Sequence, residues 1–166
     1  MRLKPLEEWI CDTCKKVISR PEQGQVEWLR DEEDKVHSFR ICHNAVHSPI
    51  RISSSNDPAL GPDCRTLGRI ASVLDLKTMT GTSGMEWMIS FLDAGIITVP
   101  DAESPLIVNE ARNWKDTFRR LFFPYYEEAR MSFEAAEAGG FFINKDDVSR
   151  YSKDALKSII EKYGND

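Results

Sequence analysis

Apolar and polar residues alternate in two short segments of the N-terminal third, which is the period of a half-buried β-strand. In the first segment, residues 25–29, Val26 and Trp28 fall on one face. The second segment, residues 36–43, alternates in the same way, and the acidic residues of 30–35 between them predict a solvated turn. Two such segments around a polar turn predict an antiparallel β-hairpin.

From about residue 62 onward the apolar residues recur every three or four positions, which is the period of an α-helix. Residues that start or stop helices mark the predicted elements: Asp63 as an N-cap, Ser83 with Glu86 before Gly95, Ser104 before Pro105, Pro124 before Gly139-Gly140, and Ser152. The faces predicted to be buried are Leu67, Ile70, Ala71 and Leu74; Met85, Met88, Ile89 and Leu92; Ile107, Ala111, Trp114, Phe118, Leu121 and Phe122; and Leu156, Ile159, Ile160 and Tyr163.

A stretch rich in Ser, Pro, Gly and Asn, residues 48–62, separates the two patterns and predicts a loop or linker. The predicted fold class is therefore α+β, with a small β-hairpin module over residues 1–60 and a mostly α-helical domain over residues 61–166. A β module of that size buries too little apolar surface to fold alone, so we expect it to need a metal ion.

The composition is that of a folded protein, because 41% of the 166 residues are hydrophobic and 30% are charged. The longest apolar runs are much shorter than the roughly 20 residues that a membrane-spanning helix requires. The N-terminal residues, Met1 to Glu8, lack the apolar segment of a signal peptide. We therefore expect a cytoplasmic protein with no membrane partner.

The formal net charge of −5 argues against binding to duplex DNA, which requires an excess of basic side chains. Residues 38–56 are a local exception, because they contain Arg40 and Arg51 and no acidic residue. Two arginines are a weak electrostatic signal, and ordinary surface arginines beside a loop are the favoured explanation of them. A protein is therefore the favoured partner and nucleic acid is a weakly supported one, while the oligomeric state stays unknown.

All four cysteines and all three histidines lie in the first 64 residues. Cys11-x-x-Cys14, which we call the knuckle, allows a redox and a metal interpretation. A thioredoxin-like site needs a helix after the first cysteine, whereas Pro21 and Gly24 interrupt the segment that follows. The metal interpretation is favoured, because such a turn aims two thiolates at one Zn²⁺, which then needs two further ligands.

Strand geometry selects among the candidates at the end of the hairpin. Neighbours on a strand point to opposite faces, so Cys42 and His43 are not both expected to bind. His43 shares its face with apolar residues that should turn toward the knuckle, and His47 follows at a spacing that lets two imidazoles meet one ion. The predicted zinc ligands are Cys11, Cys14, His43 and His47, with Cys42 as the first alternative and Cys64 as the second; His37 is expected to be a strand residue only.

The order of a Cys-x-x-Cys knuckle, a hairpin and a second ligand pair resembles a zinc ribbon, although the common ribbon ends in another Cys-x-x-Cys. The chain also resembles a group of uncharacterised bacterial proteins through Trp9-Ile10-Cys11-x-x-Cys14, Val26-Glu27-Trp28, Phe39-Arg40-Ile41-x-His43, Leu60-Gly61-Pro62-Asp63 and Pro124-x-Tyr126-Glu127-Glu128-Ala129-Arg130. This resemblance implies a bacterial source and a metal knuckle, and it implies no activity.

A catalytic zinc keeps one position open for water and lies beside a general acid or base. The chain has neither a His-Glu-x-x-His motif nor the His-x-Glu and Pro-Cys-x-x-Cys pattern of zinc deaminases. Four ligand candidates favour a closed, structural zinc, and no catalytic residue is predicted. The expected function is a non-enzymatic interaction module; the alternative is a zinc- or cysteine-dependent hydrolase acting on nucleic acid or peptide near His43, His47 and Cys64.

Overall fold

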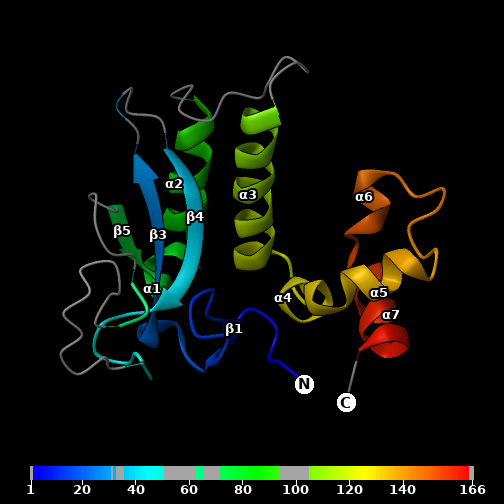
Figure 1. Ribbon diagram of the computed structural model, residues 1–166, viewed down its shortest axis with the longest axis horizontal. Coiled ribbons are helices and arrows are strands. Elements are labelled where there is room, and N and C mark those ends of the chain that lie inside the picture. Colours follow the sequence, from blue (N-terminus) through cyan, green and yellow to red (C-terminus); the bar gives the residue numbers. More distant parts are fainter. Residues whose placement is uncertain are drawn as a thin grey trace.

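The computed structural model describes residues 2–30, 32, 36–50, 63–65, 72–93 and 105–164. These residues form two small antiparallel sheets and a set of helices, which confirms the predicted α+β class. Within these ranges, none of the helices has the length and apolar character needed to cross a membrane. In Figure 1 the strands lie on one side of the long helix α3 (Pro105–Phe122), and the C-terminal helices lie on its other side.

The larger sheet has the strand order β4-β3-β5, and it contains the predicted hairpin. The strand β3 (Gly24–Arg30) pairs antiparallel with β4 (Val36–His43). The register shifts between Glu27 and Leu29, and Ser38 opposite this shift has a left-handed φ of 56°. Because this bulge interrupts the strict alternation, Val36 and Phe39 are both buried, whereas His37 between them is only half-buried.

The strand β5 (Ser72–Asp75) pairs with the other edge of β3, where Leu74 lies opposite Val26. The helix predicted to start at Asp63 and to bury Leu74 is therefore corrected, because residues 72–75 belong to the sheet. The other predicted members of its buried face, residues 67, 70 and 71, lie outside the described residues. The physical reason is that the free edge of β3 needs partners for its backbone N–H and C=O groups.

Two helices follow this strand, α1 (Leu76–Met79) and α2 (Thr82–Asp93). The predicted buried face of α2 is corrected: Met88 is fully buried, but Met85 and Ile89 are 40% and 39% exposed, and Phe91 is buried instead. A Cβ on Gly84 would lie 2.0 Å from the carbonyl oxygen of Met79, so this glycine is what lets α2 approach α1 and sets its rotation.

The start of α2 also differs from the prediction, because the helix begins at Thr82, so that Ser83 lies inside the helix. The side chain of Leu92 and the predicted stop at Gly95 lie outside the described residues. The helix α3 begins at Pro105 as predicted, and Trp114 and Leu121 are buried as predicted. The side chains of residues 107 and 111 lie outside the described residues.

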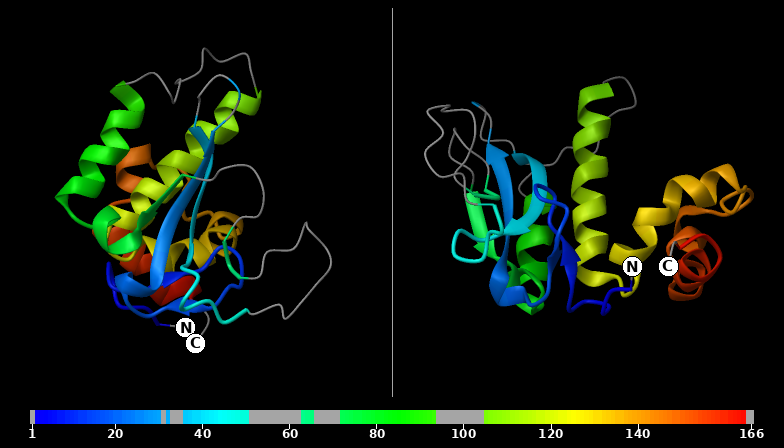
Figure 2. Two further views of the ribbon diagram at one scale, coloured as in Figure 1. Left: turned by 90° about the vertical axis from the view of Figure 1, so that its left-hand side faces the viewer. Right: turned by 60° about the horizontal axis from the view of Figure 1, so that its bottom comes forward.

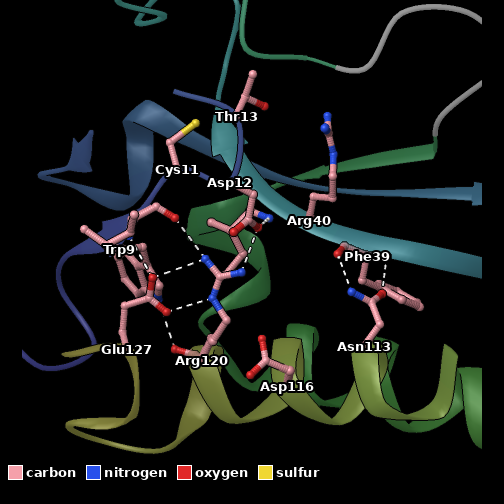
Figure 3. Close-up of polar contacts among 12 residues, drawn as sticks. Trp9, Cys11, Asp12, Thr13, Phe39, Arg40, Asn113, Asp116, Arg120 and Glu127 are labelled. Atoms are coloured by element: carbon pink, nitrogen blue, oxygen red, sulfur yellow. Dashed lines mark hydrogen bonds and ion pairs between the residues drawn. The ribbon is translucent and has the colours of Figure 1, made fainter. Parts of the chain in front are cut away.

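The helix α3 packs on β4, where the side chain of Asn113 binds both backbone groups of Phe39. Its Oδ1 accepts the Phe39 N–H, and its Nδ2 donates to the Phe39 carbonyl oxygen at 3.0 Å (Figure 3). The buried face of α3 also contains Thr117 and Arg120, two polar residues that an apolar helix face does not predict.

After Pro124 the chain forms α4 (Tyr126–Ala129), the 3-10 turn η2 (Arg130–Ser132) and α5 (Phe133–Ala138), which stops at Gly139-Gly140 as predicted. The helices α6 (Asp147–Arg150) and α7 (Lys153–Tyr163) follow. The Ser152 hydroxyl accepts the Ala155 N–H at 3.3 Å, which confirms the predicted cap of α7.

The described side chains form two hydrophobic clusters. One extends from Trp9 to Leu121 and includes residues of the sheet, α1, α2 and α3. The other joins Tyr126 and its neighbours to Leu156 and the rest of the inner face of α7. Figure 2 shows these C-terminal helices grouped beside the sheet-containing part. The division of the chain at residue 60 stays a prediction, although apolar side chains from both of its sides share the first cluster.

The close approach at Gly84 generates a stability test. We expect Gly84→Ala to lower the free energy of unfolding by about 2 kcal/mol or more, because the new methyl group meets the backbone of Met79. Gly81→Ala is the matched control, since a Cβ there lies 3.7 Å from its nearest neighbour, the Thr78 carbonyl oxygen. Urea unfolding followed by circular dichroism measures both; equal stability of the two variants would contradict the proposed constraint.

Candidate metal centre

Four potential metal ligands lie together at one end of the larger sheet: Cys11, Cys14, His43 and Cys64. Their ligand atoms are all within 4.8 Å of one another. The His43 Nδ1 is 3.5 Å from the Cys14 Sγ and 3.9 Å from the Cys64 Sγ. Two ligands on a tetrahedral Zn²⁺ lie roughly 3.3–3.8 Å apart, given metal–ligand distances of about 2.0–2.3 Å. The four residues are therefore close enough to bind a metal ion.

The knuckle is the turn between two very short paired strands, β1 (Trp9–Ile10) and β2 (Val17–Ile18), and the 3-10 turn η1 (Pro21–Gln23) leads on to β3. The Lys15 N–H donates to the Cys11 carbonyl oxygen at 3.0 Å, and Lys15 has a left-handed φ of 61°. The Cys14 N–H points to the Cys11 sulfur at 3.5 Å. This tight turn therefore holds both sulfur atoms on one side, as a bound ion requires.

The imidazole of His43, the last residue of β4, is oriented by a backbone carbonyl group. Its Nε2 lies 3.3 Å from the Val17 carbonyl oxygen. Because a carbonyl oxygen can only accept a hydrogen bond, Nε2 is the protonated nitrogen. The other nitrogen, Nδ1, then presents its lone pair to the cysteines. Burial lowers the pKa of His43, and this favours the neutral form that binds a metal.

Cys64 is held in place by two hydroxyl groups. The Ser48 hydroxyl accepts the Cys64 N–H at 3.0 Å and lies 3.1 Å from its sulfur, while the Thr13 hydroxyl donates to its carbonyl oxygen at 2.6 Å. Thr13 belongs to the knuckle, so this last bond connects Cys64 directly to the turn that carries Cys11 and Cys14. Both Cys64 and Ser48 are buried.

The three sulfur atoms differ in acidity. Burial by itself raises the pKa of Cys11, but backbone N–H groups, those of Cys14 and His43 above all, outweigh it and hold this pKa below its usual value. Burial raises the pKa of Cys14, and it raises that of Cys64 to about 12. A metal ion that binds here must therefore displace protons from Cys14 and Cys64.

The structure brings together Cys11, Cys14 and His43 from the predicted ligand set, together with Cys64, the second alternative. His47 is exposed, and its Nδ1 lies 2.9 Å from the Asn44 Oδ1. Cys42, the first alternative, is buried but is not one of the four grouped ligands, and its pKa is raised by burial and by the nearby Glu27. The actual ligand set stays a proposal.

A network of buried charges lies directly beneath the knuckle (Figure 3). At its centre the Arg120 side chain of α3 is only 3% exposed. Its Nη1 donates to the Asp12 Oδ2 at 2.7 Å, and its Nε donates to the Glu127 Oε2 at 2.7 Å. The Nη2 donates to the Ile10 carbonyl oxygen at 2.9 Å. One guanidinium group thus connects β1, the knuckle and α4.

The acidic partners of Arg120 are themselves fully engaged. Asp12 and Ile41 exchange two hydrogen bonds, since the Asp12 N–H donates to the Ile41 carbonyl oxygen at 2.8 Å and the Ile41 N–H donates to Oδ2 at 2.7 Å. Glu127 accepts the Ile10 N–H at 2.8 Å and the Arg130 Nε at 2.9 Å. With two arginines and two carboxylates the network is electrically neutral, which is what burial requires.

Sequence reasoning missed Asp12, Arg120 and Glu127. The apolar pattern of α3 does not point to Arg120, which lies about 100° around the helix from Leu121 and outside the face predicted to be buried. The pairing of Asp12 with Arg120 spans 108 positions of the chain, and no local pattern reports such a contact.

No protein-family model, curated protein or solved structure matches this chain. The resemblances to a zinc ribbon and to a group of bacterial proteins therefore stay predictions, and the grouped cysteines and histidine are the finding that bears on them.

The charge network predicts a large loss of stability when its cation is removed. Arg120→Met should lower the free energy of unfolding by about 3–5 kcal/mol, because Glu127 would be left buried without this partner. Arg2→Met is the control: Arg2 is 74% exposed and lies 3.9 Å from Glu128, so no measurable change is expected. Chemical denaturation measures both variants, and a wild-type stability for Arg120→Met would show that the network does not support the fold.

The network also predicts a pH dependence. Burial alone would raise the pKa of Glu127, but Arg120 and Arg130 outweigh it and hold this pKa below its usual value. The stabilisation is therefore complete above the pKa of Glu127 in the unfolded chain, about 4.3, and it is lost as the pH falls through the lower pKa of the folded state. Between pH 7 and pH 3, wild-type stability should fall more steeply than that of Glu127→Gln. Glu134→Gln, at an exposed site on α5, should keep the wild-type slope.

Proposed function

We propose that this chain is a zinc-binding, non-enzymatic interaction protein in which Cys11, Cys14, His43 and Cys64 hold a structural Zn²⁺. The observation that supports the proposal is the compact group of four ligand atoms, all within 4.8 Å of one another. Three thiolates and one imidazole are a common ligand set of structural zinc. Because four protein ligands complete a tetrahedron, no position is left for the water or substrate of the alternative hydrolase.

The proposed zinc joins segments that are too short to be stable by themselves. The strands β1 and β2 have two residues each, and the ion would fasten the turn between them to the end of β4 and to Cys64. Its binding free energy would then contribute directly to folding. The proposal includes the zinc-ribbon likeness, with His43 and Cys64 in the positions of the usual second pair.

We propose protein as the class of partner. The support is the exposed side of α2, where Met85 and Ile89 lie one helical turn apart and are 40% and 39% exposed. Neighbouring apolar side chains at the surface are typical of protein interaction sites. A bacterial source and a cytoplasmic location complete the proposal; the first rests on the sequence resemblance alone, and the second rests on composition.

The ligand set is tested by comparing two substitutions. The wild-type protein should contain one zinc per chain by elemental analysis and should melt at a lower temperature in a strong chelator. Cys64→Ser should reduce zinc content and remove most of the chelator sensitivity, whereas His47→Ala should retain both. The reverse result, with loss of zinc in His47→Ala and retention in Cys64→Ser, would exclude Cys64 in favour of His47.

Substitution with Co²⁺ provides a second measurement that does not depend on stability. A tetrahedral site with three thiolates should give visible d–d bands and a strong thiolate-to-cobalt charge-transfer band. The charge-transfer band should weaken in Cys64→Ser and stay unchanged in His47→Ala and in the wild type at high salt. A chain that binds neither metal would disprove the zinc proposal.

A further inference from the structure

A groove of about 450 Å³ lies between α3 and α6, and the residues that line it are not those of the candidate metal centre; we call it the basic groove. Arg112, Lys115 and Arg119 line it from α3, and Arg150 lines it from α6. The three residues of α3 are spaced by three and four positions, so they share one face of the helix. In Figure 1, α6 lies on the same side of α3 as the other C-terminal helices.

The groove is strongly cationic, although the whole chain carries a formal charge of −5. Among the lining residues that the structure describes, the acidic one is Asp116, whose Oδ1 accepts the Tyr126 hydroxyl at 2.8 Å. Within the part of the chain that the structure describes, Arg112 and Lys115 form no ion pair and no side-chain hydrogen bond. Like charges that converge without counter-charges repel one another, and a bound anion relieves this repulsion.

Two of the arginines are held in position by contacts that leave donors available. The Arg119 guanidinium lies on the Tyr151 ring, 3.8 Å from the ring centroid, and stacking of this kind leaves the N–H groups at its edge free. The Arg150 Nε donates to the Lys145 carbonyl oxygen at 2.9 Å, which leaves its terminal nitrogens for other partners. These two arginines are thus positioned before any ligand arrives, and this lowers the entropic cost of binding.

We propose that the basic groove binds a ligand with two or more neighbouring phosphate groups. Each phosphate group of such a ligand carries between about one and two negative charges, and an arginine side chain can bind two of its oxygens at once. Four cations against one carboxylate match two such groups better than a single carboxylate ligand. The volume also lies within the roughly 300–1,000 Å³ of small-molecule sites. A free nucleoside polyphosphate and consecutive nucleotides of a single strand both supply this chemistry.

The experiment uses the full-length, zinc-loaded protein and three probes: inorganic pyrophosphate, ATP and a single-stranded uridine decamer. Binding is measured by isothermal titration calorimetry at low and at moderate salt. The variant Arg112→Gln/Lys115→Gln should bind each probe that the wild type binds with an affinity lower by about tenfold or more. The reason is that charge-assisted contacts are lost. The control Lys162→Gln, at an exposed site on α7, should bind as the wild type does.

The outcomes separate the two sources of phosphate. Pyrophosphate and ATP binding without tighter binding of the decamer supports a free polyphosphate ligand. Decamer binding that is about tenfold tighter, with a steeper salt dependence, supports single-stranded nucleic acid. Thermal melting of the double variant at the wild-type temperature confirms that its fold is intact. No binding of any probe at low salt, or equal binding by the double variant, would overturn the proposal while leaving the zinc site unaffected.

Discussion

The buried guanidinium group of Arg120 is the constraint on which the arrangement of this protein depends. A cation that is 3% exposed is tolerated only where its N–H groups find acceptors and its charge is neutralised. The acceptors come from Ile10, Asp12 and Glu127, which lie on β1, in the knuckle and on α4. These segments cannot separate without leaving a charge buried and unpaired, so one side chain determines how the N-terminal turn meets the C-terminal helices.

The same turn serves two structures at once, because its successive residues point in different directions. Cys11 and Cys14 face the metal centre, Asp12 faces Ile41 and Arg120, and the Thr13 hydroxyl donates to the carbonyl oxygen of Cys64. Any movement of the knuckle on loss of a bound ion would therefore displace the carboxylate that neutralises Arg120. Through this connection, the proposed zinc would affect the contact between α3 and the N-terminal turn as well as the ligands themselves.

Elements whose ends depend on local chemistry were predictable from the sequence. The hairpin, the start of α3 at Pro105, the stop at Gly139-Gly140 and the Ser152 cap all follow from residues within a few positions of one another. The strand β5 was not predictable in this way, because its reason to exist is the unpaired edge of β3, distant in sequence. The rotation of α2 likewise depends on the close contact between Gly84 and the backbone of Met79.

The sequence by itself determined the chemistry available to this protein: a Cys-x-x-Cys turn, a histidine at the end of a strand, and the clustering of all cysteines and histidines near the N-terminus. Only the tertiary structure decided that Cys64 joins Cys11, Cys14 and His43 while His47 stays at the surface. It also decided that Arg150 meets the basic face of α3 in an otherwise acidic chain. The physical reason is common to both: ligand groups and charges act through distances in space, which local periodicity does not encode.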